Sequence, residues 1–306
     1  MTTSTIETMH NNTTTTHPTV IKRSNNNIYT PNPAADYRFI VKLQDGRTLV
    51  SCHADNAVLV ANEAGDVVSC VETEFSRPEG IAVNNSTGEI LIVDRYNHCI
   101  QVLNNDLKHQ RSIVTDFQPC GKLNQPVGIA ISSTGDRIFV ADNENHRVLI
   151  LDAKGKYLDT LGKGYGTAPG NMYCPCGIAL YNHPIHGELA IVSEWGGGRV
   201  QVFRVINGDL FSIFGGIAHA HHVVVDQGGV VYVSEYATRR IKRFCLDGDW
   251  RDQWGASAVS LVVAEGSGGL AMVVTQKQVI QIENNNNDSD LLLPQKRRRE
   301  NDAYDY

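Results

Sequence analysis

The amino-acid sequence predicts an all-β protein built from six copies of a four-stranded unit. The stretch "RPEGIAVNNSTGEILIVDRYNHCIQVLNNDLKHQRSIV" from Arg77 is followed by "QPVGIAISSTGDRIFVADNENHRVLILDAKGKYLDTLG" from Gln125, with the same features in the same order. Each copy has a Pro-x-Gly entry, an apolar strand, a glycine turn, a second strand ending in Asp, an Asn-His loop and two further strands. An all-strand repeat of this length is typical of a β-propeller.

Weaker copies extend the repeat in both directions. "CPCGIALYNHPIHGELAIVSEWGGGRVQVFRVINGDLFSIFGG" begins at Cys174, "HAHHVVVDQGGVVYVSEYATRRIKRFCLDGDWRDQWG" begins at His219, and a degenerate copy lies on each side of the set. The residue just before each first strand marks the copies: Arg38, Gly80, Gly128, Gly177, His222 and Ser260. Their separations are 42, 48, 49, 45 and 38 residues. Since one sheet cannot bury both of its faces alone, we expect a six-bladed propeller with four antiparallel strands per blade.

The last copy contains three recognisable strands, "SLVVA", "LAMVVT" and "VIQIE", before a run of four asparagines. Its fourth strand is expected to come from "TVIK" at 19–22 or from "DLLL" at 290–293. We favour 19–22, because pairing the two ends of the chain closes the ring and removes an exposed sheet edge.

The predicted propeller occupies residues 35–283, between two polar tails. Residues 1–34 are rich in Thr and Asn, and residues 284–306 are polar and charged, so neither has the apolar content to offset the entropy of ordering, and both are expected to be disordered. The run "KRRR" at 296–299 is a candidate nuclear import signal. A cytoplasmic location is the default expectation, with the nucleus as the alternative.

Composition narrows the class of protein further. The chain has 306 residues, is 42% hydrophobic and carries seven cysteines in no regular spacing. It has no apolar run of the roughly 18 residues that span a bilayer, and we expect reduced thiols without a structural disulfide. The net charge is -6, and residues 35–283 hold 21 Lys and Arg against 27 Asp and Glu, which counts against a general nucleic-acid binder.

The second and third copies resemble NHL repeats, which are named for an Asn-His-Leu-like triplet. Here the triplet is "NHC" at 97–99 and "NHR" at 145–147, and the sequence on either side of it is also similar to the NHL repeat. The resemblance implies a propeller that binds protein or RNA, often at the C-terminal end of RING-type ubiquitin ligases. More distant relatives of this kind, the peptidyl-amidoglycolate lyases, hold zinc in the axial channel.

The resemblance to the lyases can be tested residue by residue. Their zinc histidines occupy the x of Pro-x-Gly in three alternate blades. The corresponding positions here read Tyr37, Glu79, Val127, Cys176, His221 and Val259. Of these only His221 matches, and its alternate-blade partners Tyr37 and Val127 are poor zinc ligands. We therefore predict no metal, no cofactor and no catalytic residue, and interpret Glu79, Cys176 and His221 as polar lining of the axial channel mouth.

The propeller meander collects the Pro-x-Gly entries and the Asn-His loops on one face. We interpret His98 and His146 of these loops as structural, each satisfying a turn or a neighbouring blade. Aromatic and guanidinium groups on the same face are typical of recognition surfaces. The predicted binding face comprises Arg77, Arg95, Tyr96, Tyr165, Tyr173, Trp195, Arg199, Tyr236, Arg239 and Arg240.

These observations predict a monomeric, non-catalytic interaction module that binds protein partners, such as acidic peptides, on one face. By resemblance, it would act as an adaptor or substrate-recognition component linked to ubiquitin ligase machinery, with the RING segment supplied by a partner. Binding of single-stranded RNA through the basic segment 239–243 is the first alternative. A metal-dependent lyase or hydrolase is the second.

Overall fold

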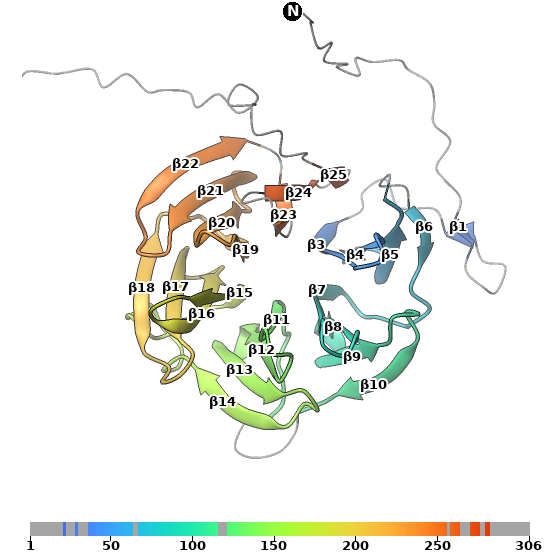
Figure 1. Ribbon diagram of the computed structural model, residues 1–306, viewed down its shortest axis with the longest axis horizontal. Coiled ribbons are helices and arrows are strands. Elements are labelled where there is room, and N and C mark those ends of the chain that lie inside the picture. Colours follow the sequence, from blue (N-terminus) through green and yellow to red (C-terminus); the bar gives the residue numbers. More distant parts are fainter. Residues whose placement is uncertain are drawn as a thin grey trace, which may run out of the picture.

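Six β-sheets form a ring around a central axis in the computed structural model of the protein (Figure 1). The structure describes residues 21–22, 28–29, 36–63, 67–115, 121–255, 258–263, 270–275 and 279–281. Within these ranges, five sheets have four antiparallel strands in sequential order, with the first strand innermost. The repeat seen in the sequence is therefore a propeller blade.

The strand boundaries follow the repeat. The first blade contains β3 (Tyr37–Lys42), β4 (Thr48–Cys52), β5 (Ala57–Ala61) and β6 (Val67–Cys70). The second contains β7 (Pro78–Val83), β8 (Ile90–Asp94), β9 (Cys99–Leu103) and β10 (His109–Ile113). The third contains β11 (Ile129–Ile131), β12 (Arg137–Asp142), β13 (Arg147–Asp152) and β14 (Tyr157–Leu161).

The next two blades have the same plan. The fourth contains β15 (Pro175–His183), β16 (Gly187–Glu194), β17 (Arg199–Arg204) and β18 (Leu210–Gly215). The fifth contains β19 (Ala220–Val225), β20 (Val230–Glu235), β21 (Arg240–Cys245) and β22 (Trp250–Gly255). Short 3₁₀ turns, Arg95–Asn97 and Asn143–Asn145, join the second and third strands of blades two and three. None of the helices in the described ranges has the length and apolar character needed to cross a membrane.

The sixth sheet differs from the prediction. It has three strands in the described residues, β23 (Ala258–Val263), β24 (Leu270–Thr275) and β25 (Val279–Gln281), and lies between blade five and blade one (Figure 1). Where six four-stranded blades were predicted, the described residues therefore form five four-stranded blades and one three-stranded sheet.

The strand expected to complete the sixth sheet stays a prediction. Residues Ile21–Lys22 (β1) pair with Ile28–Tyr29 (β2) and lie beside β6 of the first blade, and the register shows no pairing of β1 with β25. Residues 290–293, together with 1–20 and 284–306 of the predicted tails, lie outside the described residues.

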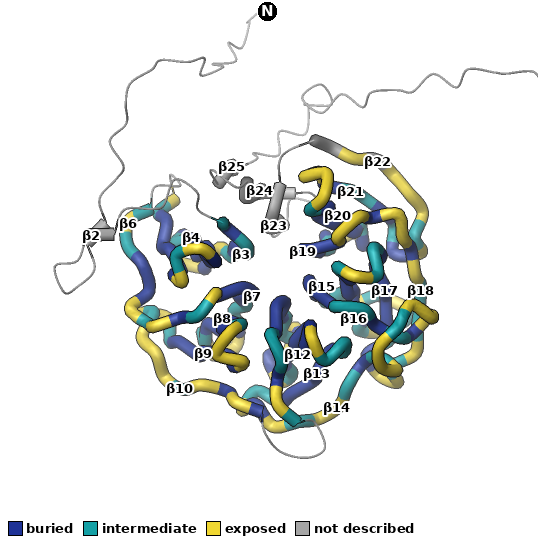
Figure 2. The backbone as a smooth tube through the Cα atoms, turned by 180° about the vertical axis from the view of Figure 1, so that it is seen from behind, coloured by how far each residue is buried: buried dark blue, intermediate teal, exposed yellow. Residues whose placement is uncertain are grey.

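The hydrophobic core lies between successive blades. The middle strands are buried on both faces, as in β8, where all five residues are buried, whereas the outer strands are largely exposed (Figure 2). Between blades two and three, Leu91 and Val102 pack with Ile129 and Ile138. Each interface removes a layer of aliphatic side chains from water, which is the main favourable contribution to stacking the blades.

Glycines at the inner strands allow the blades to approach closely. The Gly80 amide donates to the Val127 carbonyl of the next blade over 2.8 Å. A Cβ atom at Gly128 would lie 2.3 Å from the carbonyl oxygen of Cys176, and one at Gly177 would lie 2.5 Å from that of His221. The Pro-x-Gly entry thus needs glycine because another blade's backbone occupies the space of a side chain.

We expect Gly128→Ala to lower the free energy of unfolding by about 1–3 kcal/mol, because the clashing atom is a backbone carbonyl that cannot rotate away. Gly215→Ala is the matched control, since its Cβ would lie 3.8 Å from the nearest atom. Urea unfolding of both variants tests the expectation. Equal stability of the two variants would show that the blades tolerate a wider spacing.

Candidate functional site

The acidic residue that ends each second strand is a structural anchor. Asp142 is fully buried, and its Oδ1 accepts the backbone N–H of Asn124 over 2.7 Å. Its Oδ2 accepts bonds from Asn145 Nδ2 and Arg147 Nε, each over 2.8 Å. One carboxylate therefore ties the incoming loop, the 3₁₀ turn and the third strand together.

The histidines of the two Asn-His loops link successive blades. His98 Nδ1 accepts the backbone N–H of Gln125 over 3.1 Å, and His146 Nδ1 accepts that of Cys174 over 3.2 Å. Both histidines have the left-handed backbone conformation, with φ of 54° and 55°, and this conformation ends the 3₁₀ turn. The prediction that these histidines are structural is confirmed.

Glutamate replaces this aspartate in blades four and five. Glu194 Oε2 accepts the backbone N–H of Tyr173, and its Oε1 accepts a 2.9 Å bond from Arg199 Nε. Arg199 is 8% exposed and also donates to the carbonyl of Asn171 over 2.8 Å. Although Arg199 was expected on the binding face, the structure places its side chain inside the fold, where it holds the loop before β15.

The pairing of β3 shows that the predicted axial residue of blade one was wrong. Tyr37 pairs with Cys52 as Pro175 pairs with Glu194, and the register then shifts in both blades. Arg38, and not Tyr37 as predicted, therefore occupies the x position, and Phe39 takes the place of glycine.

Three serines on the second strands support this register. The Phe39 amide donates to Ser51 Oγ over 2.9 Å. The Gly177 amide makes the same bond to Ser193 Oγ, and the His222 amide makes it to Ser234 Oγ, each also over 2.9 Å. Phe39, Gly177 and His222 are therefore equivalent positions.

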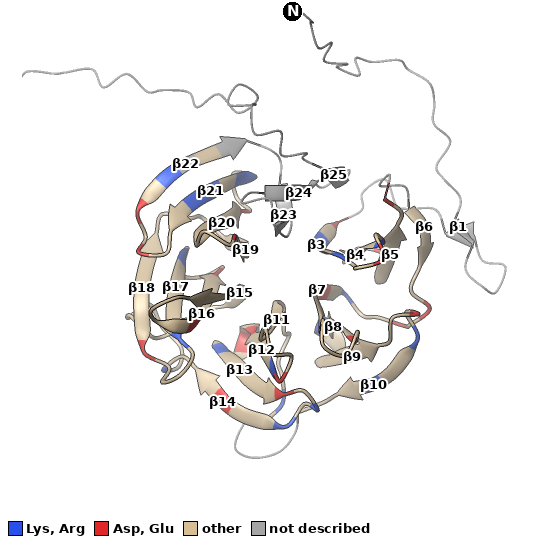
Figure 3. Cartoon of the chain, viewed as in Figure 1, with Lys and Arg blue, Asp and Glu red and all other residues tan. Residues whose placement is uncertain are grey.

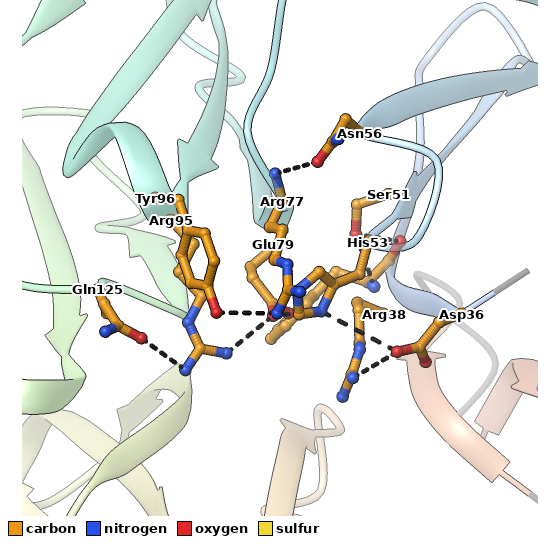
Figure 4. Close-up of polar contacts among 11 residues, drawn as sticks. Asp36, Arg38, Ser51, His53, Asn56, Arg77, Glu79, Arg95, Tyr96 and Gln125 are labelled. Carbon is orange, nitrogen blue, oxygen red and sulfur yellow. Dashed lines mark hydrogen bonds and ion pairs between the residues drawn. The ribbon is translucent and has the colours of Figure 1, made fainter.

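Charged side chains gather where blades one and two meet at the axis, and we name Asp36, Arg38, His53, Glu79 and Arg95 the charged cluster (Figure 4). Glu79 Oε1 lies 3.2 Å from His53 Nδ1 and 3.2 Å from Arg95 Nη1. Arg38 is paired with Asp36, and the two guanidinium groups flank Glu79 and His53. Most other charges of the ring lie at strand ends and on outer strands (Figure 3).

Burial sets the protonation of this cluster. Burial, with the nearby guanidinium groups of Arg38, Arg77 and Arg95, lowers the pKa of His53 to about 3, so its ring is neutral at physiological pH. Complete burial raises the pKa of Glu79, and the two flanking arginines oppose that rise. The guanidinium groups therefore carry the positive charge at this end of the axis.

Two residues of the predicted binding face extend the charged cluster outward. Arg77 Nη1 donates to the Tyr96 hydroxyl over 2.8 Å, and its Cζ lies 4.5 Å from the centre of the Tyr96 ring. Arg95 Nη2 donates to Gln125 Oε1 over 3.2 Å. Arg77, Arg95 and Tyr96 therefore lie together, with Tyr96 42% exposed.

Aromatic side chains gather at the entry of blade five, and we name Trp195, His219, His221 and Tyr236 the aromatic cluster. The centre of the Trp195 ring lies 4.5 Å from that of His219, 5.0 Å from that of Tyr236 and 5.8 Å from that of His221. The Cζ atom of Arg38 lies 5.5 Å from the centre of the Tyr236 ring. Arg38 thus joins the charged cluster to the aromatic cluster.

Apolar side chains from three blades pack together beside these clusters. Phe39, Val127 and Cys176 form one buried group, with Trp195 packed against it. The Phe39 ring centre also lies 4.5 Å from that of His222. The charged and aromatic clusters therefore border a buried apolar group.

The remaining predicted residues lie in two further groups. The rings of Tyr165 and Tyr173 lie 5.1 Å apart, with His146 4.7 Å from Tyr165, which is 62% exposed. Arg239 and Arg240 are exposed beside Tyr236 in the chain. Lys242, also in the basic segment, is paired with Glu235 over 2.6 Å and is largely buried.

Comparison with known proteins agrees with this construction. The NHL repeat family model matches residues 75–103 and 123–151, the segments that contain both Asn-His loops. These two segments, in blades two and three, match the NHL repeat. The matched segments contain the buried aspartates that anchor the loops and the histidines that link successive blades. A search of curated proteins gave no significant match.

Solved structures with a similar fold include three propellers at low sequence identity. A nidogen/laminin complex gives a TM-score of 0.61 at 15% identity over 75% of this chain and 84% of that chain. A streptogramin B lyase gives 0.57 at 15% identity over 81% and 93%, respectively. Virginiamycin B lyase from Staphylococcus aureus gives 0.58 at 13% over 82% and 86%. At such identities the similarity establishes the fold alone.

The axial residues of this propeller do not resemble a zinc site. With Arg38 in blade one, the alternate-blade set that contains His221 reads Arg38, Val127 and His221. Burial also raises the pKa of the Cys176 thiol well above its usual range, which disfavours the thiolate that a metal requires. In the part of the chain that the structure describes, no three His, Cys, Asp or Glu side chains are grouped to hold a metal ion.

Sequence reasoning missed Arg38, His53 and Asp36 as members of the site. Blade one lacks the Pro-x-Gly motif, and the alignment of its sequence to the repeat is therefore one residue out of register. Ser193, the residue just before the end of β16, has counterparts in Ser51 of β4 and Ser234 of β20. Aligning these serines would have placed Arg38 beside Glu79.

We expect Asp142→Ala to lower the free energy of unfolding by about 3–5 kcal/mol, since it leaves a buried backbone N–H and the Arg147 guanidinium without their acceptor. Glu144→Ala, at an exposed acid two residues away, is the matched control and should change stability by less than about 0.5 kcal/mol. Chemical unfolding at pH 7 measures both. Similar losses in the two variants would contradict the anchoring role.

Burial of His222 should make stability depend on pH. Burial lowers its folded-state pKa to about 3, whereas an unfolded histidine titrates near 6.5. Below about pH 6.5 the unfolded chain takes up a proton that the folded chain does not, so this contribution is complete above pH 6.5 and is lost as the pH falls toward 3.

We therefore expect His222→Gln to reduce the loss of unfolding free energy between pH 7 and pH 5 by about 2 kcal/mol. Urea titrations of wild type and variant at several pH values measure the difference, in which all other titrating groups cancel. Parallel curves for the two proteins would contradict a buried neutral His222.

Proposed function

We propose that this NHL propeller binds a protein partner through the end of the ring that carries the charged and aromatic clusters. The observation that supports it is their meeting at Arg38, which lies between Glu79 on one side and the Tyr236 ring on the other. Rigid aromatic rings beside guanidinium groups are the commonest hot spots of protein interfaces. The NHL propeller fold is in general suited to protein interaction.

The strand architecture supports such a role physically. The start of β7 pairs with the end of β8, through Pro78 and Asp94, so the inner-strand entries and the loops after the second strands share one end of the ring. Buried carboxylates hold these loops in place, as Asp142 does in blade three. A rigid scaffold reduces the entropy lost when a partner binds.

The resemblance to propellers of RING-type ubiquitin ligases suggests the class of partner. In that role the chain would select substrates or act as an adaptor, and the RING segment would come from another subunit. Reconstitution with activating and conjugating enzymes tests this: chain formation should require an added RING protein. Ubiquitin transfer by this protein without such a subunit would contradict the adaptor role.

Exposed Arg239 and Arg240 beside Tyr236 favour a second candidate, binding of single-stranded RNA. Affinity for RNA would then fall steeply with salt and with Arg239→Ala. A titration with short single-stranded RNAs distinguishes the two candidates, because a protein-binding propeller whose residues 35–283 are mildly acidic overall should give no saturable shift.

We expect Trp195→Ala with Tyr236→Ala to abolish capture of the partner in a pull-down with the full chain, since truncating hot-spot aromatics costs 2 kcal/mol or more each, about thirtyfold or more in affinity. Ile185→Ala with Ile206→Ala is the control, because these side chains are 82% and 88% exposed in loops at the other end of blade four. Loss of the partner only with the isoleucine pair would move the binding surface to the other end of the ring.

A further inference from the structure

Several buried polar atoms of the charged cluster have no hydrogen-bond partner. Within the described residues these include Glu79 Oε2, His53 Nε2, Arg38 Nε and Arg95 Nε. Glu79 is fully buried, and the side chains of His53 and Arg38 are 8% and 13% exposed. Buried polar groups are nearly always paired, because an unmade bond costs free energy. Their convergence in one cluster indicates a place built for a polar ligand.

The charges of the cluster specify the sign of that ligand. The cluster itself is balanced, because the guanidinium groups of Arg38 and Arg95 face the carboxylates of Asp36 and Glu79, and His53 is neutral. Arg77, which extends the cluster outward, adds one uncompensated positive charge. It suits a monoanion such as a carboxylate, whereas a phosphate dianion would bring excess negative charge next to buried Glu79.

The donors of the cluster suit a carboxylate as well. Arg95 uses Nη1 on Glu79 and Nη2 on Gln125, which leaves Nε as a donor, and Arg38 uses Nη2 on Asp36 and likewise keeps Nε. The two guanidinium groups lie on either side of Glu79 (Figure 4). A ligand carboxylate bound beside Glu79 would accept from both guanidinium groups, and charge-assisted bonds of this kind are about twice as strong as neutral ones.

The aromatic cluster indicates what should be attached to the carboxylate. The Tyr236 ring lies next to Arg38, and Trp195 packs on both Tyr236 and the buried group of Phe39, Val127 and Cys176. An apolar side chain adjacent to the carboxylate would therefore be covered.

We propose that Arg38 and Arg95 of the charged cluster bind a carboxylate group of a partner peptide, with a neighbouring apolar side chain packed on Trp195 and Tyr236. This proposal rests on the proposed function, because the peptide belongs to the partner protein. It specifies the chemistry of recognition: an acidic peptide. The carboxylate can come from an Asp or Glu side chain or from a chain terminus.

The test is a selection of displayed 12-residue peptides against the full chain, followed by titration of the selected peptides as fluorescent synthetic peptides. We expect enrichment of Asp or Glu next to an apolar residue. Replacing that acid by its amide should weaken binding at least tenfold, the effect of losing a charge-assisted bond. Amidated and free C-termini of the same peptides distinguish a side-chain carboxylate from a terminal one.

Arg38→Gln and Arg95→Gln should each weaken the acidic peptide at least tenfold and leave the amide peptide unchanged. Arg95→Lys keeps the charge but loses the planar donors, so it should lie between wild type and Arg95→Gln. Arg47→Gln is the matched control, since Arg47 lies in the turn between β3 and β4 at the opposite end of blade one and is paired with Asp45. Thermal unfolding checks that each variant is folded.

The carboxylate proposal would be overturned by selection of peptides without an acid, by no enrichment, or by equal binding to wild type and folded Arg38→Gln and Arg95→Gln. These outcomes are separable from failure of the proposed function. A partner lost with Trp195→Ala and Tyr236→Ala but retained with both arginine variants would keep the binding face and remove the carboxylate site.

Discussion

A buried carboxylate at the end of the second strand is the interaction on which the ring depends. In blades two to five the position holds Asp94, Asp142, Glu194 and Glu235. Each accepts the backbone N–H of the loop that enters its own blade, as Asp94 does from Ser76 over 2.7 Å and Glu235 does from Ala218 over 2.8 Å. Because the same group also binds the loop leading to the third strand, the charge fixes both chain segments at one end of the ring.

The NHL histidine then extends this local anchor to the next blade. His98 and His146 accept backbone N–H groups of residues that begin the following repeat. Stacking of aliphatic side chains supplies most of the free energy of association between blades, but it does not fix their rotation. The directional bonds from carboxylate and imidazole do, which is why the loops at this end can present side chains in defined positions.

The candidate site lies where two blades depart from the repeat. Where blades two, three and four have glycine, blade one has Phe39 and blade five has His222, and the centres of their rings lie 4.5 Å apart. The x positions beside them hold Arg38 and His221. Arginines and aromatic rings therefore border a buried apolar group near the axis, and this arrangement supports the proposed recognition of a partner.

The sequence by itself determined the all-β propeller, the four-strand blade and the structural role of His98 and His146. Hydrophobic periodicity and turn residues are local features, and the same features recur in each repeat. Arg77, Arg95 and Tyr96 were also placed on one face by the repeat alone. Only the tertiary structure decided that Arg199 is buried, that the last sheet has three described strands, and that Arg38 lies beside Glu79, His53 and Tyr236. These facts depend on strand register and on contacts between blades, and a one-residue shift in a degenerate repeat changes which side chain reaches the axis.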